Sequence, residues 1–176
     1  VDPEFAYLTG KHMEHYLNDV SIAQKYAHLN RKAMISEIVK YMGWHIEREF
    51  DTIHNYADTE AKILRKGAIS AKAGEEVLIP INMRDGSILA TCKGNADWNQ
   101  SAPHGAGRLF SRTQAKKTFE MEDYIETMKG VYTTSVSPST LDEAPFAYKT
   151  MEEILERTAD TFEVKAILNP LYNFKA

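Results

Sequence analysis

Cysteine is nearly absent from this sequence, which has a single one, Cys92, in 176 residues. One thiol cannot form an internal disulfide framework and is typical of a reducing cytosol, so we expect a cytoplasmic protein. We interpret Cys92 as a buried structural thiol. No apolar run approaches the roughly 20 residues that cross a bilayer, which predicts that the chain has no membrane-spanning helix.

An excess of positive charge is also missing, because the formal net charge is −4. This argues against a simple basic domain that coats nucleic acid. An RNA enzyme remains compatible with the composition if cations gather around one channel, and Arg108, Arg112, Lys116 and Lys117 form such a cluster. The spacings HxH, HExxH and CxxC are absent, so the sequence offers no complete metal site, and a metal would need ligands from elsewhere.

What is present is typical of soluble globular proteins: 43% hydrophobic and 26% charged residues, in a length that suits one domain. Residues 1–5, Val-Asp-Pro-Glu-Phe, resemble an expression scar and are excluded from fold reasoning. If an expression scar precedes a sequence that starts inside a longer protein, the chain is a fragment of that protein, and this is what we expect. We expect residues 6–176 to form one mixed α/β unit.

Periodicity gives the expected elements. Apolar positions at helical spacing over residues 18–42, followed by Gly43, predict one long helix. Residues 94–107 form a polar, glycine-bearing loop too long for a simple connector. The fold class is therefore mixed α/β (α+β), a long N-terminal helix followed by a mixed sheet with helices. The other predicted elements are strands at 45–53, 61–65, 77–80, 87–92 and 162–168, and helices at 113–117, 121–128 and 150–157.

The glycine-bearing loop contains the arrangement with the clearest chemical meaning, a histidine followed by small residues and an arginine. Small residues let a ligand approach the backbone, and glycine amides can cradle phosphate. An arginine adds bidentate phosphate recognition, and a histidine in such a nest can attack phosphorus to form a phosphoramidate. A glycine turn with an incidental histidine is the alternative, and the residues alone leave it open. The run is His104, Gly105, Ala106, Gly107 and Arg108.

The remaining candidates carry weaker signals. His54 precedes Asn55, and from the residues alone a core histidine bonded to a neighbour is the better interpretation. Arg65 and Lys66 before Gly67 are a weak phosphate signal, because most such pairs are solvated strand ends. The other histidines fit surface positions without a role. They are His12, His15, His28 and His45.

Several motifs, in order, resemble the RNA-splicing ligase RtcB family over almost the whole chain from about Tyr16. The fixed order of these motifs makes the match specific, since an unrelated nucleotidyltransferase with a convergent glycine loop would need all of them to coincide. The resemblance implies an RtcB-like fold, of which this chain is the C-terminal part. Its motifs are Asn30-Arg31, His54-Asn55-Tyr56, Arg65-Lys66-Gly67-Ala68, Gly74-Glu75, Ile79-Pro80, the run from His104 to Arg108, Asp142-Glu143-Ala144-Pro145, Ala147-Tyr148-Lys149 and Lys175.

The resemblance implies an RNA ligase of RNA repair or tRNA splicing. The family joins an RNA 2′,3′-cyclic phosphate or 3′-phosphate end to a 5′-hydroxyl end. It uses GTP and manganese, through a histidine–GMP intermediate and then an RNA 3′ end activated with GMP. The implied partners are GTP and RNA, either tRNA halves or broken ends. An accessory activation factor and the oligomeric state are left open.

The resemblance also implies roles for individual residues. His104 is the guanylylated nucleophile, Arg108 contacts phosphate and Lys66 is the active-site lysine. Arg108, Lys66 and manganese would stabilise the negative charge that develops on the phosphate during attack. Guanylylation should fail when His104 is protonated. His54 matches a histidine that binds one of two manganese ions. The implied GTP contacts are Gly105, Ala106 and Gly107 in the loop, Tyr148 and Lys175 at the guanine, Ser87 in the guanine pocket and Asn82 in place of a serine.

The sequence departs from the family in two respects. Residues 80–84 read Pro-Ile-Asn-Met-Arg where the family usually has Pro-Gly-Ser-Met-Gly, so Asn82 can still hydrogen-bond while Ile81 and Arg84 restrict the backbone near GTP. The family's Asp-x-Cys-Gly motif and two further metal histidines have no counterpart. We therefore expect an inactive piece with an incomplete metal site and exposed apolar surfaces that drive association. The alternative is a non-catalytic RtcB-like RNA- or nucleotide-binding or regulatory module.

Overall fold

The structure, a computed structural model, describes residues 6–174. These residues form two compact units. Unit 1 comprises residues 6–51 and 56–65, and unit 2 comprises residues 52–55 and 66–174. Helices and strands together confirm the mixed α/β class, whereas the expectation of one unit is replaced by two.

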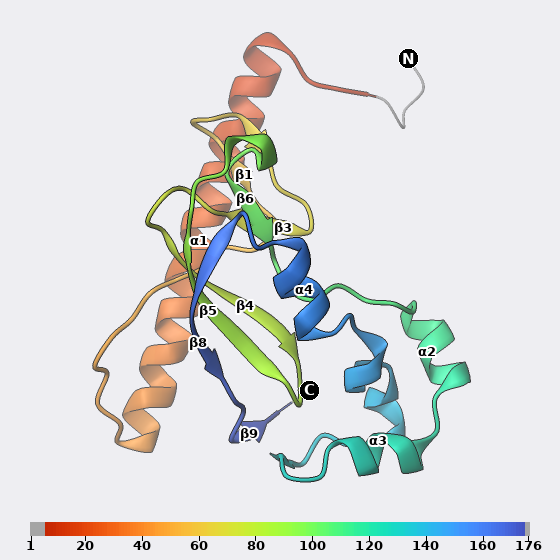
Figure 1. The fold of residues 1–176 in the computed structure, drawn as a ribbon. Helices are drawn as coiled ribbons and strands as arrows, with labels where there is room; N and C mark the ends of the chain where they lie inside the picture. Colours follow the sequence, from red (N-terminus) through yellow and green to blue (C-terminus); the bar gives the residue numbers. More distant parts are fainter. Residues whose placement is uncertain (1–5, 175–176) are drawn as a thin grey trace. The chain divides into compact units, whose positions relative to one another are not determined.

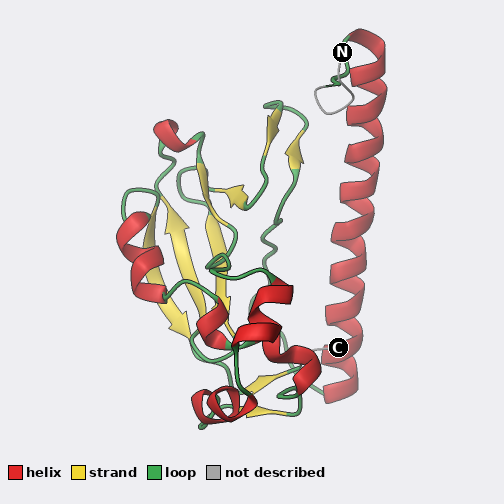
Figure 2. Ribbon diagram, turned by 90° about the vertical axis from the view of Figure 1, so that its right-hand side faces the viewer, coloured by secondary structure: helices red, strands yellow, loops and turns green. Residues whose placement is uncertain are grey.

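Unit 1 is built on one long helix, α1 (Gly10–Met42), drawn as a continuous red ribbon in Figure 2. Its predicted end is confirmed. Gly43 adopts the left-handed conformation with φ 64°, and its N–H donates to the Lys40 carbonyl at 3.3 Å. The helix begins earlier than predicted, because Met13 and Leu17 extend the apolar spacing toward the N-terminus.

The rest of unit 1 contains little regular structure. The hairpin of β1 (Ala57–Asp58) and β2 (Ile63–Leu64) replaces the longer strand predicted at 61–65. The strand predicted at 45–53 is wrong, since residues 45–53 include no strand. A strand needs a hydrogen-bonding neighbour, and alternation of residue types cannot show whether one exists.

Arg65, in unit 1, is a structural residue rather than a phosphate ligand. Its side chain is buried and its guanidinium lies 5.4 Å from the centre of the Tyr56 ring. The same group donates to the Tyr56 hydroxyl at 3.2 Å and lies 3.7 Å from the Asp58 carboxylate. Burial with these partners explains Arg65 without any ligand, whereas Lys66 beside it is exposed.

Unit 2 is organised by a three-stranded antiparallel sheet in the order β4-β5-β8 (Figure 1). The strands are β4 (Glu76–Asn82), β5 (Gly86–Cys92) and β8 (Phe162–Leu168), which confirms the strands predicted at 77–80, 87–92 and 162–168. The turn between β4 and β5 depends on Gly86. Its φ is 78°, and an added Cβ would lie 2.0 Å from the Leu168 carbonyl oxygen.

Smaller elements surround this sheet. The predicted helices are confirmed as α2 (Arg112–Thr118), α3 (Met121–Thr127) and α4 (Met151–Arg157). The predicted loop 94–107 contains η2 (Ala96–Trp98) and β6 (Ser101–Pro103), which pairs with β3 (Ala68–Ser70). The remaining elements are η3 (Pro138–Glu143), η4 (Pro145–Ala147) and the parallel pair of β7 (Tyr132–Thr133) and β9 (Tyr172–Asn173).

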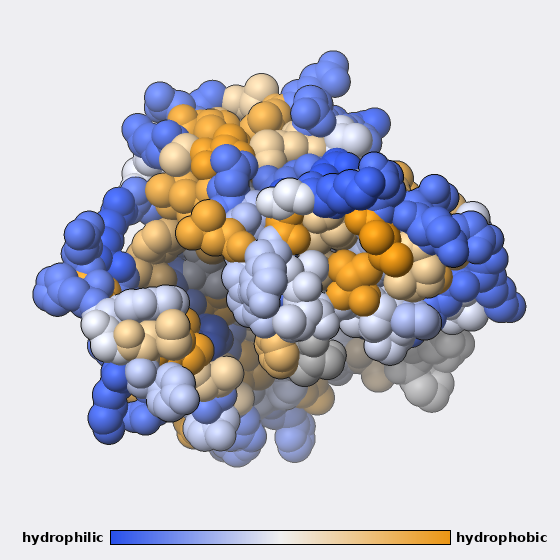
Figure 3. Space-filling view, turned by 90° about the horizontal axis from the view of Figure 1, so that it is seen from below, coloured by the Kyte–Doolittle hydropathy of each residue, from blue (hydrophilic) through white to orange (hydrophobic). Residues whose placement is uncertain are grey.

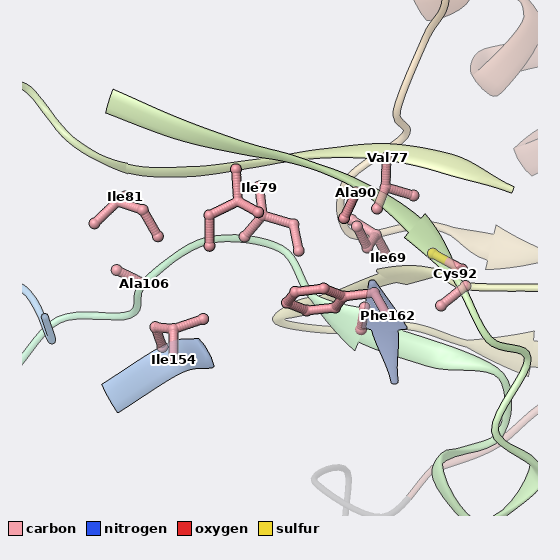
Figure 4. Close-up of a cluster of buried hydrophobic side chains, with 12 residues drawn as sticks. Ile69, Val77, Ile79, Ile81, Ala90, Cys92, Ala106, Ile154 and Phe162 are labelled. Carbon is pink, nitrogen blue, oxygen red and sulfur yellow. The ribbon is translucent and has the colours of Figure 1, made fainter. Parts of the chain in front are cut away.

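Both clusters of buried hydrophobic residues found in the described chain lie in unit 2. The first joins the sheet to α4 and to the loop after β6, with Ile79, Ile154 and Phe162 among its members (Figure 4). The second surrounds Tyr124, whose hydroxyl lies 3.2 Å from the Met83 sulfur. The first cluster also contains Cys92, so the interpretation as a buried thiol is confirmed, and burial raises its pKa to about 11.

Large hydrophobic side chains are nevertheless exposed on both units, and Figure 3 shows apolar groups at the surface of one face. Tyr41 and Leu171 are each 90% exposed. The expectation of exposed apolar surfaces is therefore confirmed, while their role in association stays a prediction. Among the described residues, none of the helices is both long and apolar enough to cross a membrane.

Candidate nucleotide site

The loop that carries His104 is fixed by its backbone on two sides. The His104 N–H donates to the Gly67 carbonyl at 3.4 Å, and the Ala106 N–H donates to the Pro80 carbonyl at 3.2 Å. Ala106 is 3% exposed and belongs to the core beside Ile81 (Figure 4). This anchoring places His104 at the edge of the core.

Close packing explains the first glycine of the run. A Cβ on Gly105 would lie 3.0 Å from the Pro80 carbonyl oxygen, which is tighter than side chains normally tolerate. Gly107 has no such neighbour, but its φ of 73° is a conformation that glycine adopts without strain. Both glycines therefore serve the backbone path that turns around His104.

A pocket of about 790 Å³ opens next to this loop, and every residue that lines it belongs to unit 2. Lys66 is exposed and is not among the lining residues, and Lys175 lies outside the described residues. Most of the predicted site therefore comes together in one place. The predicted residues on its wall are His54, Asn82, Ser87, His104, Gly105, Ala106, Gly107, Arg108 and Tyr148.

The two histidines of the pocket lie side by side, in an edge-to-face arrangement. The ring centres of His54 and His104 lie 5.8 Å apart, with an angle of 62° between the ring planes. Asn55 lies beside them in the left-handed conformation, with φ 52°. Its side-chain oxygen accepts from the Gly67 N–H at 2.6 Å, which leaves its amide nitrogen 3.5 Å from Nδ1 of His104. At that length the contact orients the imidazole weakly and leaves either tautomer accessible.

The described residues do not form a complete metal site. Nowhere in the described part of the chain do three His, Cys, Asp or Glu side chains gather closely enough to hold an ion. Manganese normally takes several oxygen and nitrogen ligands, and His54 with His104 supplies at most two nitrogens. The donor set present therefore does not fit a complete manganese centre.

Arg108 connects three segments around the pocket. Its Nε donates to the Phe110 carbonyl at 3.2 Å, one terminal nitrogen donates to the Tyr148 hydroxyl at 2.9 Å, and the other donates to the Asp142 carbonyl. Its guanidinium carbon also lies 5.0 Å from the centre of the Tyr148 ring. Arg108 therefore holds the glycine loop against the Asp142–Tyr148 segment. A phosphate could accept hydrogen bonds only from those guanidinium N–H groups that these contacts leave available.

Tyr148 is held as firmly as Arg108. Its hydroxyl donates to the Glu143 carboxylate while it accepts from Arg108. Burial raises the pKa of Tyr148 above its ordinary value, and the hydrogen bond to Glu143 and the negative charge there raise it further. The hydroxyl therefore stays protonated and fixed in place at neutral pH.

Comparison with known proteins identifies the family. The model of the family described as tRNA-splicing ligase RtcB matches residues 1–176. The chain belongs to the RtcB family. The RNA-splicing ligase RtcB of Escherichia coli K12 is 33% identical over 171 residues, which cover 88% of this chain and 42% of that protein. The tRNA-splicing ligase RtcB of Aeropyrum pernix is 34% identical over 139 residues, 63% of this chain and 29% of that protein. The chain thus spans less than half the length of these relatives.

In this RtcB-family chain, the residue in place of the family serine stabilises a turn. The Asn82 side-chain oxygen accepts from the backbone N–H groups of Arg84 and Asp85, both at 2.9 Å. Its amide donates to the Asp85 carboxylate at 2.8 Å. Both lone pairs of the oxygen are used, so one amide N–H remains for a nucleotide.

Several lining residues have no assignment from the sequence. Arg112 follows the glycine loop, and Glu143 precedes the Ala-Pro of the Asp-Glu-Ala-Pro motif. Asn173 reaches the wall from β9 and donates to the Met83 carbonyl at 2.5 Å. The motif was a usable signal for Glu143. Nothing local in the sequence marks Asn173, because its place depends on pairing between distant strands.

Proposed function

We propose that this chain supplies the nucleotide-binding side of a GTP- and manganese-dependent RNA ligase. The ligase joins 2′,3′-cyclic phosphate or 3′-phosphate ends to 5′-hydroxyl ends through a histidine–GMP intermediate. One observation carries the proposal: His104 lies in a glycine-lined wall of a pocket that Tyr148 and His54 also line. The pocket volume of about 790 Å³ is in the range of small-molecule sites, which supports a nucleotide as the ligand.

The chemistry proposed for His104 is a substitution at phosphorus. An unprotonated ring nitrogen attacks the α-phosphorus of GTP, a P–N bond forms, and the bond to the bridging oxygen of the leaving pyrophosphate breaks. The reaction therefore needs neutral His104 at the moment of attack. Arg108 and Arg112 line the same pocket and supply positive charge near the phosphates.

Manganese remains a proposal in which His54 is one ligand. The ion would act as a Lewis acid on the phosphates. Since the described residues do not hold a complete site, we assign no step to the metal and expect its other ligands outside the described residues. Lys66 and Lys175 stay predictions as an active-site lysine and a guanine contact.

RNA with the ends named above is the proposed substrate, either tRNA halves or broken RNA, in the cytoplasm. A non-catalytic RtcB-like binding module is the second candidate. One observation favours it: the Asn82 side-chain oxygen is used within the turn, which reduces what the pocket offers to GTP.

The experiment is covalent labelling of the full-length protein with α-³²P-GTP and manganese. An acid-labile adduct that disappears in His104→Ala and persists in His12→Ala is expected. His12 is a matched control because it is an exposed helix residue of unit 1. An adduct that survives His104→Ala would refute the assignment of the nucleophile. A wild-type protein without any adduct would favour the non-catalytic module.

A further inference from the structure

The Asp-Glu pair at the end of η3 is the centre of a charge cluster that the proposed reaction does not explain. Asp142 is 3% exposed and lies 3.7 Å from Arg108, 3.6 Å from Arg112 and 3.3 Å from Lys116. Glu143 lies 3.5 Å from Arg108 and 3.4 Å from Arg112. Three cations thus share two carboxylates at the edge of the pocket.

The two carboxylates differ in where they point. Asp142 is not among the pocket-lining residues, and its partner Lys116 is also bonded to the Ser139 carbonyl at 2.8 Å, so Asp142 ties α2 to η3. Glu143 lines the pocket and accepts the hydrogen bond of the Tyr148 hydroxyl. Glu143 therefore contacts three side chains that line the pocket, one tyrosine and two arginines, and can fix their positions.

Glu143 acts on these side chains in two ways. Its acceptor oxygen fixes the direction of the Tyr148 O–H, and Arg108 then donates to the oxygen of that same hydroxyl. Its charge also draws Arg112 toward the pocket, although the Arg112 side chain is 74% exposed. Ion pairs of exposed groups are weak alone, but a network in which each member has two partners restrains them all.

We infer that Glu143 is a positioning residue for the pocket: through Tyr148, Arg108 and Arg112 it sets the wall against which the nucleotide binds. The inference rests on the proposed function for the identity of the nucleotide. Glu143 itself takes no part in bond making, because it acts only through these side chains. Its removal should therefore weaken binding more than it affects folding.

The test separates the charge of Glu143 from its hydrogen bond. Glu143→Gln keeps an acceptor for Tyr148 and loses the charge, Glu143→Ala loses both, and Tyr148→Phe removes the hydroxyl alone. Glu156→Gln on α4 is the matched control, since Glu156 is exposed and does not line the pocket. All variants are made in the full-length protein, and a double variant of Glu143→Ala with Tyr148→Phe completes a cycle.

Two measurements are made on each variant. The affinity for GTP should fall roughly tenfold in Glu143→Ala and in Tyr148→Phe, and the double variant should be no weaker than Glu143→Ala, because the residues act as one unit. The NMR signal of the Arg108 guanidinium should show slow rotation in the wild type and faster rotation in Glu143→Ala. Glu143→Gln should fall between the wild type and Glu143→Ala in both measurements, and Glu156→Gln should match the wild type.

The outcomes separate the inference from the proposed function. Additive losses of affinity, or an Arg108 signal unchanged by Glu143→Ala, would overturn the positioning role even if GTP binds and labels His104. If the wild type does not bind GTP, the proposed function fails, and the Arg108 signal alone then decides whether Glu143 positions the wall. Thermal unfolding of each variant checks that a lost affinity does not come from a lost fold.

Discussion

Helix α1 in unit 1 and the sheet in unit 2 show two ways in which apolar residues are used. None of the residues of α1 is buried, and side chains such as Ile22 and Tyr26 are more than half exposed. In the sheet, Ile79 and Ile88 are fully buried. Helical spacing therefore shows that a segment can form an amphipathic helix, but it does not show what that helix packs against.

The difference also concerns what stabilises each region. Proteins take most helical stability from tertiary packing of an apolar face, and none of the residues of α1 is buried within the described residues. Unit 2 has two buried clusters. We therefore expect equivalent substitutions to cost much more in unit 2 than in unit 1, and the following pairs test this expectation.

The largest difference should come from two glycines with similar backbone angles. Gly86→Ala places a Cβ 2.0 Å from the Leu168 carbonyl oxygen, so we expect a loss of more than about 4 kcal/mol in the free energy of unfolding, or no folding at all. Gly43→Ala meets nothing within 4 Å, and its left-handed φ alone should cost about 1–2 kcal/mol. Urea denaturation measures both. Similar losses would show that α1 is as constrained as the sheet.

The next largest difference should come from two isoleucines. Ile79→Ala removes a fully buried side chain from the core and should cost about 2–5 kcal/mol. Ile22 in α1 is 62% exposed, so Ile22→Ala should change the free energy of unfolding by less than about 0.5 kcal/mol. A large loss in Ile22→Ala would reveal that α1 is covered in solution. Analytical ultracentrifugation of the same samples would then identify self-association as the cause.

A smaller, pH-dependent effect should come from Cys92. Burial, followed by the negative charge of Glu75, raises its pKa to about 11 from an ordinary value of 9.0. A raised folded pKa means that the stabilisation is fully present below pH 9 and is lost as pH rises toward 11. The wild type should therefore lose stability relative to Cys92→Ala over this interval. Slow reaction with a thiol reagent in the folded state is the companion measurement, and rapid labelling at pH 8 would contradict burial.

The smallest effect should come from the ion pairs of Asp51 in unit 1. Hydrogen bonding to Arg31, and then to His28, lowers the pKa of Asp51, while partial burial opposes the shift. A lowered folded pKa stabilises the protein above the unfolded pKa, and that stability disappears as pH falls through the folded value. Because these groups are largely exposed, Asp51→Asn should cost only a few tenths of a kcal/mol. Its effect should shrink in 1 M salt, and salt-independent loss would point to packing instead.

Local patterns predicted the strands of the main sheet and the four α-helices of the described residues, including the end of α1 before Gly43. They failed where structure depends on distant partners. Residues 45–53 carry β-like residues but include no strand, and the short pairs β3–β6 and β7–β9 join segments that are far apart in the sequence. Division into two units was likewise invisible, because no linker-like composition marks it.

The site divides in the same way. His104 and its glycines were candidates from their chemistry, since such residue types and spacing can form a phosphate-binding loop, and they line the pocket. His54, Tyr148 and Ser87 came only from the family resemblance, and all three line the pocket. The use of Arg108 as a link between segments was not predictable from the sequence. Its partners Asp142 and Tyr148 approach it only after the chain has folded.

The pairing of β5 with β8 determines when the pocket can form during synthesis of the chain. β5 is the central strand of the sheet, yet its partner β8 begins only at Phe162. Leu168 at the end of β8 and Asn169 and Pro170 beyond it line the pocket. Contacts between distant segments close late in folding, and a chain emerging from the ribosome exposes its C-terminal segment last. The His104 loop is therefore synthesised well before the opposite wall of the pocket exists. On the ribosome, competence to hold a nucleotide should therefore arrive only after β8 and the residues that follow it in the pocket wall have been translated.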